Sequence, residues 1–386
     1  MRLRCRVWAA LALFASAGCG QLFLEDARVD AGAVTVDRGI EAAVDGASEE
    51  GGPPSEGGMA EMGPTDVAPE ASLRDVDRTP DSDGSADDLA LDESLPEPLA
   101  PILCGRPLAE LEFDAPELIA EVASLIEAIM PGRPGVHFDP AFSADGLTLY
   151  FTSDHEFEFK VWSVSRATLD GPFDALERGP ADINGDFTFR TDQFGFQPLE
   201  SLNLAAITAS YPVMDLEPPG RSHAFVGRFA GGAYEWSVSP VSFLHESISD
   251  VRLSLDGLRL YYEAPGAGER DIYVSERPDL ASAFETFDRV PFVTQDENDS
   301  APAPVRDPDT LLFVRAGTDT GDDLFVTNLG LDGRPVEPVE LVGLNSSEFD
   351  GEPVVLELPG RCELVFVSSR GDAFKLWRSV ITPRTE

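Results

Sequence analysis

The hydrophobic and polar positions divide the chain into two parts. From about residue 107 onwards, short runs of apolar, aromatic and β-branched residues alternate with Gly, Pro, Asp and Asn. Runs of this length and spacing predict short β-strands. Residues 143–151 and 254–262 share one pattern, Ser-x-Asp-Gly-Leu-x-Leu-Tyr followed by an aromatic residue. Such repetition predicts an architecture built from one repeated unit.

The second strand of each unit gives the period. The similar runs at 260–262, 312–314 and 365–367 are spaced by 52 and 53 residues. The preceding run, at 149–151, lies 111 residues earlier, which is two periods. A degenerate unit fills that gap, with strands expected at 204–207 and 223–228. The chain therefore contains five units.

Each unit has the same internal order of elements. A first strand leads through a tight turn, Asp145-Gly146 or Asp256-Gly257 in the clearest cases, into the second strand. A third strand follows, and a fourth is expected at 173–175, 284–287 and 336–339. The last unit ends without a fourth strand, and residues 113–119 are expected to supply it. We therefore predict an all-β, five-bladed β-propeller closed by an N-terminal strand.

Six blades are the alternative, with residues 118–130 as an irregular extra unit. The apolar residues of that stretch recur at helical spacing, however, which favours a short packing helix.

Residues 140–153 resemble the WD40-like PD40 repeat of TolB-type propellers, through the pattern Pro-x-Phe-Ser-x-Asp-Gly-x-x-Leu-Tyr-Phe-x-Ser. The resemblance is good there, fair at 251–263 and weaker in the later units, and it extends over residues 107–382. It implies a propeller and no particular function, because such folds include binding modules, scaffolds and enzymes.

The segment before the repeats is strongly acidic. Between residues 25 and 97 there are 21 Asp or Glu residues and four arginines, with no aromatic residue. Such a composition cannot bury enough apolar surface to offset the loss of chain entropy. We therefore expect residues 19–103 to be a disordered acidic linker and residues 104–386 to form the propeller.

The first 18 residues are predicted to be a signal peptide. Arginines precede a short apolar stretch, and small residues lead to Cys19 in a pattern that resembles a bacterial lipobox. The resemblance implies that Cys19 is acylated. Because Gly20 rather than Asp follows it, we expect an exported outer-membrane lipoprotein that faces the periplasm or the cell surface. An ordinary secretory signal is the alternative.

Two cysteines remain for the folded part, Cys104 and Cys362. Disulfides persist in oxidising compartments, and the propeller arrangement brings these two residues together. We expect them to form a disulfide, with two free thiols as the alternative.

The formal net charge of −42 excludes electrostatic binding of nucleic acid or of an anionic membrane surface. The expected partner is a protein or polysaccharide of the cell envelope. We expect contact with the membrane through the lipid anchor only, and we expect the protein to be a monomer. None of the four histidines forms a metal-ligand motif, so no metal and no cofactor are expected.

Acidic residues recur just before the first strand of several units. They are Asp139, Asp250, Asp299, Asp350 and Glu352. First strands line the channel of a propeller, so these carboxylates could surround one mouth and bind a cationic ligand. Capping of turns is the other interpretation.

No nucleophile motif or phosphate-binding loop is present, so no catalytic residue is identified and the chain is not expected to be an enzyme. The leading hypothesis is a binding or scaffolding module for protein or polysaccharide. The alternative is a propeller glycoside hydrolase or lyase that uses channel carboxylates.

Replacing Cys19 tests the anchor. The variant Cys19→Ala cannot be acylated, so the protein should leave the membrane fraction and appear in the soluble one. Cell fractionation followed by immunoblotting measures this. An unchanged distribution would contradict acylation at Cys19.

Overall fold

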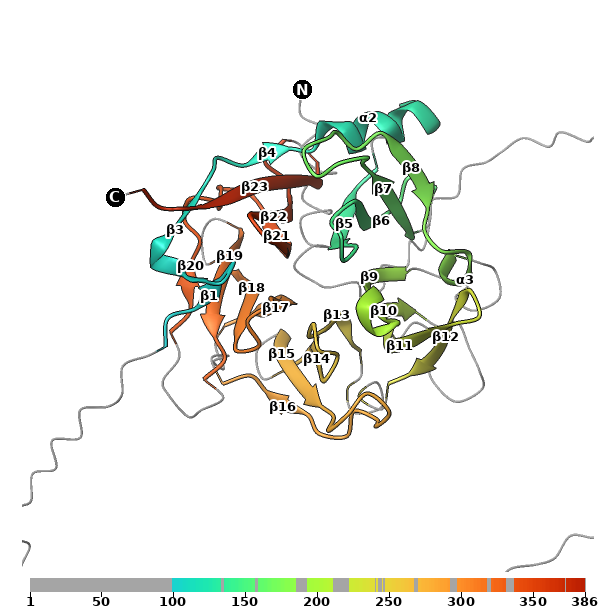
Figure 1. Cartoon of the computed structure of the whole chain (residues 1–386), viewed down its shortest axis with the longest axis vertical. Helices are drawn as coiled ribbons and strands as arrows, with labels where there is room; N and C mark the ends of the chain where they lie inside the picture. Colours follow the sequence, from blue (N-terminus) through green and yellow to red (C-terminus); the bar gives the residue numbers. More distant parts are fainter. Residues whose placement is uncertain are drawn as a thin grey trace, which may run out of the picture. The chain divides into compact units, whose positions relative to one another are not determined.

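A computed structural model describes residues 99–385 apart from short gaps (Figure 1). The gaps are residues 133–134, 157–158, 185–192, 211–221, 240, 242–244, 246, 267–269, 292–296, 318–320, 331–336 and 372. The expected signal peptide, Cys19 and almost all of the expected linker lie outside the described residues.

Five antiparallel sheets surround a common centre and form a five-bladed β-propeller, as predicted (Figure 1). Blade 1 contains β5 (His137–Phe142), β6 (Thr148–Ser153), β7 (Lys160–Ser165) and β8 (Ala175–Arg178). Blade 2 contains β9 (Gln193–Leu199), β10 (Leu204–Ser210), β11 (Ser222–Ala230) and β12 (Ala233–Val238). The degenerate unit is therefore a complete blade, and the alternative of six blades is wrong.

The other three blades repeat the order. Blade 3 contains β13 (Ser249–Leu253), β14 (Arg259–Pro265), β15 (Arg270–Glu276) and β16 (Asp288–Arg289). Blade 4 contains β17 (Asp299–Pro304), β18 (Thr310–Ala316), β19 (Asp322–Asn328) and β20 (Val339–Glu340). Blade 5 contains β21 (Asp350–Leu358), β22 (Arg361–Ser368) and β23 (Lys375–Pro383), followed by β3 (Leu111–Phe113).

The first strands β5, β9, β13, β17 and β21 contact one another in a closed ring around the centre (Figure 1). Each begins at one face of the propeller, which we call the start face. Each ends at the other face, the turn face, where the Asp-Gly turns lie. In blade 1, Asp145 accepts hydrogen bonds from Ser143 Oγ (2.7 Å) and the Leu147 amide (2.9 Å), and Gly146 has a φ of 70°. The same contacts recur around Asp256 in blade 3.

The N-terminal segment closes the ring. The expected strand is split in two, β3 and β4 (Glu117–Leu118), and both pair with β23. Pro116 lies in the interruption and has no amide hydrogen to donate to a ladder. The packing helix is present as α2 (Ala120–Ile129), which buries Val122 and Ile126.

The predicted fourth strands are displaced towards the C-terminus. Phe173 and Phe284, which were expected inside them, instead lie buried beneath guanidinium groups. Arg166 lies 4.9 Å from the Phe173 ring centre, and Arg277 lies 4.5 Å from that of Phe284. The fourth strands begin only after these contacts.

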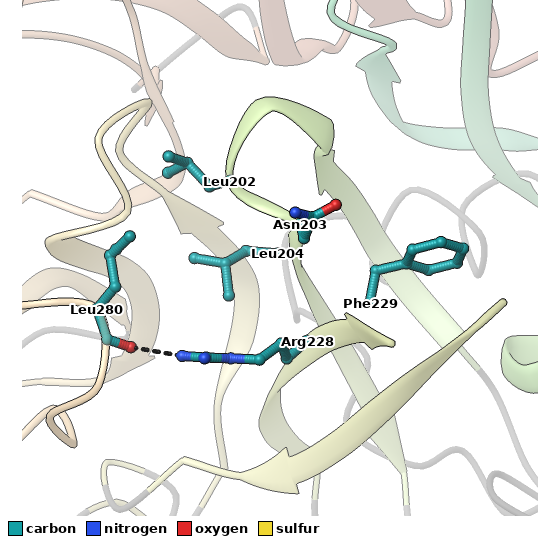
Figure 2. Close-up of a pocket in the computed structure, with 6 residues that line it drawn as sticks. All are labelled: Leu202, Asn203, Leu204, Arg228, Phe229 and Leu280. Carbon is teal, nitrogen blue, oxygen red and sulfur yellow. Dashed lines mark hydrogen bonds between the residues drawn. The ribbon is translucent and has the colours of Figure 1, made fainter. Parts of the chain in front are cut away.

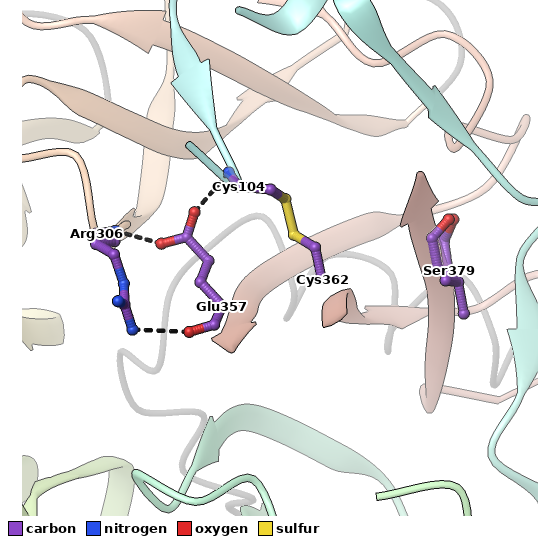
Figure 3. Close-up of a disulfide and its surroundings, with 6 residues drawn as sticks. Cys104, Arg306, Glu357, Cys362 and Ser379 are labelled. Carbon is purple, nitrogen blue, oxygen red and sulfur yellow. Dashed lines mark hydrogen bonds between the residues drawn. A yellow bond between two sulfur atoms is a disulfide. The ribbon is translucent and has the colours of Figure 1, made fainter. Parts of the chain in front are cut away.

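A disulfide joins Cys104 and Cys362, whose Cα atoms are 5.9 Å apart (Figure 3). It fixes the short hairpin of β1 (Ile102–Leu103) and β2 (Arg106–Pro107) to blade 5 at the turn face. Glu357 supports the hairpin, because its carboxylate accepts from the Cys104 amide (2.6 Å) and the Arg306 amide (2.6 Å). Leu103 is completely buried between blades 4 and 5. The N-terminal segment is therefore held to the last blade by ladders, apolar contact and a covalent bond.

Removing the disulfide should destabilise the closed ring. The bond spans 258 residues, and loss of a native disulfide costs about 2–5 kcal/mol of unfolding free energy. We expect a decrease in this range for the double variant Cys104→Ala/Cys362→Ala in urea unfolding followed by tryptophan fluorescence. Reductant should lower the stability of the parent protein to that of the variant and leave the variant unchanged. Equal stability of the two oxidised proteins would contradict this role.

Candidate functional site

Every first strand contains a β-bulge near the start face. At each bulge two residues of the first strand face one residue of the second. The first residue of each bulge has a left-handed backbone, which is strained for residues other than Gly. These residues are Asp139 (φ 53°), Gly195 (φ 66°), Asp250 (φ 48°), Ala301 (φ 47°) and Glu352 (φ 50°).

Three of these five equivalent positions carry carboxyl groups, and the bulges bring them together. The Asp139 amide donates to Glu352 Oε2 (2.5 Å), which joins blade 1 to blade 5. The side chains of Asp139 and Asp250 are hydrogen-bonded to each other. This contact crosses blade 2, where Gly195 has no side chain to separate them. Asp139 is only 3% exposed, whereas Asp250 and Glu352 are half-buried.

Arg252 lies against Asp139, Asp250 and Glu352, which together we call the carboxylate group. Arg252 Nη1 donates to the carbonyl oxygen of Gly195 (2.9 Å), and its Nη2 lies 3.6 Å from Asp139 Oδ1. A Cβ atom at position 195 would lie only 3.0 Å from Arg252 Nη1. Gly195 therefore meets two requirements, a positive φ and room for the guanidinium group.

Burial controls the protonation of the group. Burial and the negative charge of Asp250 raise the pKa of Asp139 to about 8, against the opposing effect of Arg252. Burial, with the charges of Asp139 and Asp250, also raises the pKa of Glu352 well above its ordinary value. Carboxylates this close cannot all ionise, because one guanidinium does not balance three negative charges.

The carboxylate group therefore combines proton donors with a negative charge at neutral pH. Asp139 and Glu352 retain protons, and the charge of Asp250 is one of the reasons. A protonated carboxyl group beside an ionised one is an arrangement that enzymes use for general acid–base chemistry.

The two remaining acidic residues of the predicted mouth lie elsewhere. Asp299 and Asp350 precede the bulge residues of their strands by two positions and are fully buried. Asp299 accepts two hydrogen bonds from Arg315, at 2.7 and 3.0 Å. Asp350 accepts from Arg370 Nη2 (2.5 Å) and from Ser346 Oγ (2.7 Å). Both form ion pairs within blades, and the structure does not bring them to the carboxylate group.

Sequence reasoning missed Arg252 and Gly195. Gly195 lies in the blade whose repeat pattern is most degenerate, so it was never aligned with the acidic positions. The sequence does distinguish Arg252 from its counterparts in the other repeats. The equivalent positions of blades 1, 4 and 5 are Ala141, Ala303 and Val354. A charged residue where the repeats have small apolar ones is the signal that could have identified it.

The described residues contain no group of three or more His, Cys, Asp or Glu side chains able to hold a metal ion. Within the same residues, no helix has the length and hydrophobicity needed to cross a membrane.

No protein-family model matches the sequence, and no curated protein matches it either. Solved structures do match its fold at low sequence identity. TolB from Acinetobacter baumannii has 12% identity and a TM-score of 0.38 over 66% of this chain, which spans 56% of the TolB chain. A thermostable family-43 glycoside hydrolase has 13% identity and a TM-score of 0.43 over 65% of this chain and 91% of its own. The α-L-arabinofuranosidase PaAbf62A from Podospora anserina, solved with cellotriose, has 10% identity and a TM-score of 0.44 over 66% of this chain and 93% of its own.

The expectation that the chain is not an enzyme is corrected by these neighbours. The similar structures include a glycoside hydrolase and an arabinofuranosidase. A fold of this kind hosts many unrelated functions, so the propeller by itself does not exclude catalysis. The expectation rested on the absence of short sequence motifs. Carboxylates contributed by blades far apart in the sequence form no such motif.

The raised pKa of Asp139 predicts a specific pH dependence of stability. The folded protein keeps a proton that the unfolded chain loses above its ordinary pKa of 3.8, so this contribution to stability is lost as pH rises towards about 8. We compare the parent protein with Asp139→Asn by urea unfolding at about pH 5 and about pH 8. Between the two pH values, the unfolding free energy of the parent should fall by at least about 1.4 kcal/mol more than that of the variant. This difference corresponds to a tenfold change in an ionisation constant.

His137 acts in the opposite direction. Burial and Lys375 lower the pKa of His137, so its contribution to stability is lost as pH falls below the ordinary value of 6.5. Both proteins contain His137, and its effect cancels in the comparison. Parallel pH profiles for the two proteins would contradict the protonation of Asp139.

Proposed function

We propose that the propeller hydrolyses glycosidic bonds at the start face of its channel. One observation carries the proposal: Asp139, Asp250 and Glu352 converge from three blades, and burial raises the pKa of Asp139 and of Glu352. Glycoside hydrolysis uses a pair of carboxyl groups, one to protonate the leaving oxygen and one to support the positive charge that develops on the sugar ring. The hypothesis of a glycoside hydrolase thereby replaces the binding module as the leading one.

The environments of the three groups suggest their roles. Glu352 is half-buried and has a raised pKa, so it is the group to donate a proton to the leaving oxygen. Asp250 is half-buried and carries the negative charge. Asp139 is buried between them and hydrogen-bonded to Asp250, so it is a positioning residue. Arg252 limits the rise of the pKa of Asp139 and keeps the proton exchangeable.

A polysaccharide of the cell envelope is the proposed class of substrate. The disulfide supports export, because such bonds persist in oxidising compartments and are rare in the cytosol. We propose that the protein is an outer-membrane lipoprotein held through Cys19, with the propeller carried on the acidic segment. The binding of a glycan without cleavage is the second function, and it would use the same carboxylate group.

Glu352→Gln tests the proposed acid. The variant keeps the shape of the side chain but cannot donate a carboxyl proton. Hydrolysis of a panel of aryl glycosides and envelope polysaccharides should fall by at least about 100-fold, the lower range for general acid catalysis. Reducing-sugar release measures the rate, and thermal unfolding checks that the variant is folded.

Glu285→Gln is the matched control, because Glu285 is exposed outside the channel. It should hydrolyse the panel at the parental rate. Unimpaired hydrolysis by Glu352→Gln would refute the assigned role. If the parent protein binds a glycan of the panel but releases no sugar, the channel is a binding site and the hydrolase proposal fails.

A further inference from the structure

The interfaces between neighbouring blades differ in charge at the turn face. Between blades 5 and 1, Arg166 Nη2 lies 3.4 Å from Glu363 Oε2, and both side chains are completely buried. Arg361 contacts Glu363 at 2.8 Å and Asp170 at 2.6 Å. Two arginines and two carboxylates therefore neutralise one another at this interface.

The interface between blades 2 and 3 has the same framework but lacks the carboxylates. Arg277 is the counterpart of Arg166, because Arg277 Nε donates to the Gly257 carbonyl (2.8 Å) as Arg166 Nε donates to the Gly146 carbonyl (3.0 Å). Glu363 and Leu204 lie equally far along the second strands of their blades from the residue that faces the bulge, so Leu204 is the counterpart of Glu363. By the same count, Leu202 is the counterpart of Arg361.

A second arginine replaces an apolar residue at the same interface. Arg228 pairs with Leu204, whereas Val380 pairs with Glu363 in blade 5. Arg228 Nη2 donates to the Leu280 carbonyl at 3.0 Å (Figure 2). Arg277 Nη1 donates to the same carbonyl at 3.4 Å. Two guanidinium groups thus meet where the other interface is neutral.

Neither arginine has a carboxylate within ion-pair distance among the described residues. Arg277 is only 8% exposed, and its Nη2 has no hydrogen-bond partner. Burial and the charge of Arg228 lower the pKa of Arg277, while Asp279 and Asp256 act against this at longer range. The carboxylates of Asp256 and Asp279 accept hydrogen bonds from hydroxyl and amide groups of their own turns. The local excess of positive charge is unusual in a chain with a net charge of −42.

A pocket of about 190 Å³ opens beside Arg228 (Figure 2). Its lining combines one charged and one amide side chain with apolar groups. The residues are Leu202, Asn203, Leu204, Arg228, Phe229 and Leu280. The pocket is smaller than typical sites for drug-sized ligands, which measure roughly 300–1,000 Å³. It suits a small group with a short apolar part and a negative end.

We propose that this pocket binds a carboxylate attached to a short apolar group, with Arg228 as the anchor. The ligand's carboxylate supplies Arg228 with a counter-charge, as Glu363 does for the arginines between blades 5 and 1, and the leucines cover the apolar part of the ligand. Guanidinium groups bind carboxylates through charge-assisted, often paired hydrogen bonds. The carboxylate can come from a free short-chain acid or from the C-terminus of a polypeptide that ends in a small apolar residue.

Isothermal titration calorimetry of the folded protein with isovalerate tests the site. Isovalerate should bind saturably, and the uncharged isovaleramide should not. Arg228→Gln should weaken isovalerate binding at least about tenfold, because hydrogen bonds between charged groups contribute that much or more. Arg384→Gln is the matched control: it removes one exposed arginine outside the pocket and should leave the affinity unchanged.

Leu204→Glu provides an independent test, since it places a carboxylate of the protein at the position of Glu363. It should abolish isovalerate binding and raise the midpoint of thermal unfolding. An acetylated peptide ending in valine should compete with isovalerate if the source is a polypeptide, and its C-terminal amide should not. If only isovalerate binds, the ligand is a free acid.

Two results would overturn the proposal: no saturable binding of either carboxylate, or equal binding by the parent and Arg228→Gln. Glu352→Gln should bind isovalerate as the parent does, because the pocket lies at the turn face and the carboxylate group near the start face. The outcome is therefore independent of whether the channel hydrolyses glycans.

Discussion

Closure of the ring is the constraint on which the rest of this structure depends. Each blade covers the apolar face of its neighbour, so the interface between blades 5 and 1 forms only when the last blade meets the first. The outer edge of β23 is covered by β3 and β4 from the other end of the fold. The Cys104–Cys362 bond adds a covalent connection at the same blade. The channel and the interface between blades 5 and 1 exist only in the closed ring.

Within this ring, chemistry arises where the blades depart from their own symmetry. All five first strands have a left-handed residue at the bulge, which is a requirement of the backbone. Three of these positions carry carboxyl groups, with Gly195 and Ala301 at the others, and burial raises the pKa of two of the three. At the turn face, Leu204 stands where blade 5 has Glu363, and Arg277 loses its counter-charge as a result. The two proposed sites thus have one origin, the substitution of single residues in a repeated framework.

Much of the fold could be predicted from the sequence because propeller blades are local. The Asp145-Gly146 turn, the strand that follows it and the spacing of the units are all encoded within about fifty residues. Blade 2 was placed correctly by its distance from its neighbours, although its pattern is weak. The first strands were predicted to begin too late, after the acidic residues, whereas they begin at or before them. Bulges interrupt the alternation of apolar and polar residues, so the start of each strand does not show the expected period.

The sequence by itself determined the number of blades, the closure by an N-terminal strand and the proximity of Cys104 to Cys362, because each follows from the count and order of repeated units. It also identified the acidic residues near the channel, but as one set of five. Only the tertiary structure separated Asp299 and Asp350, which pair with arginines of their own blades, from the carboxylate group of Asp139, Asp250 and Glu352. A shift of two residues along a strand decides between these environments. The pKa of Asp139 depends on burial, on Asp250 and on Arg252, and all three are set by contacts between blades.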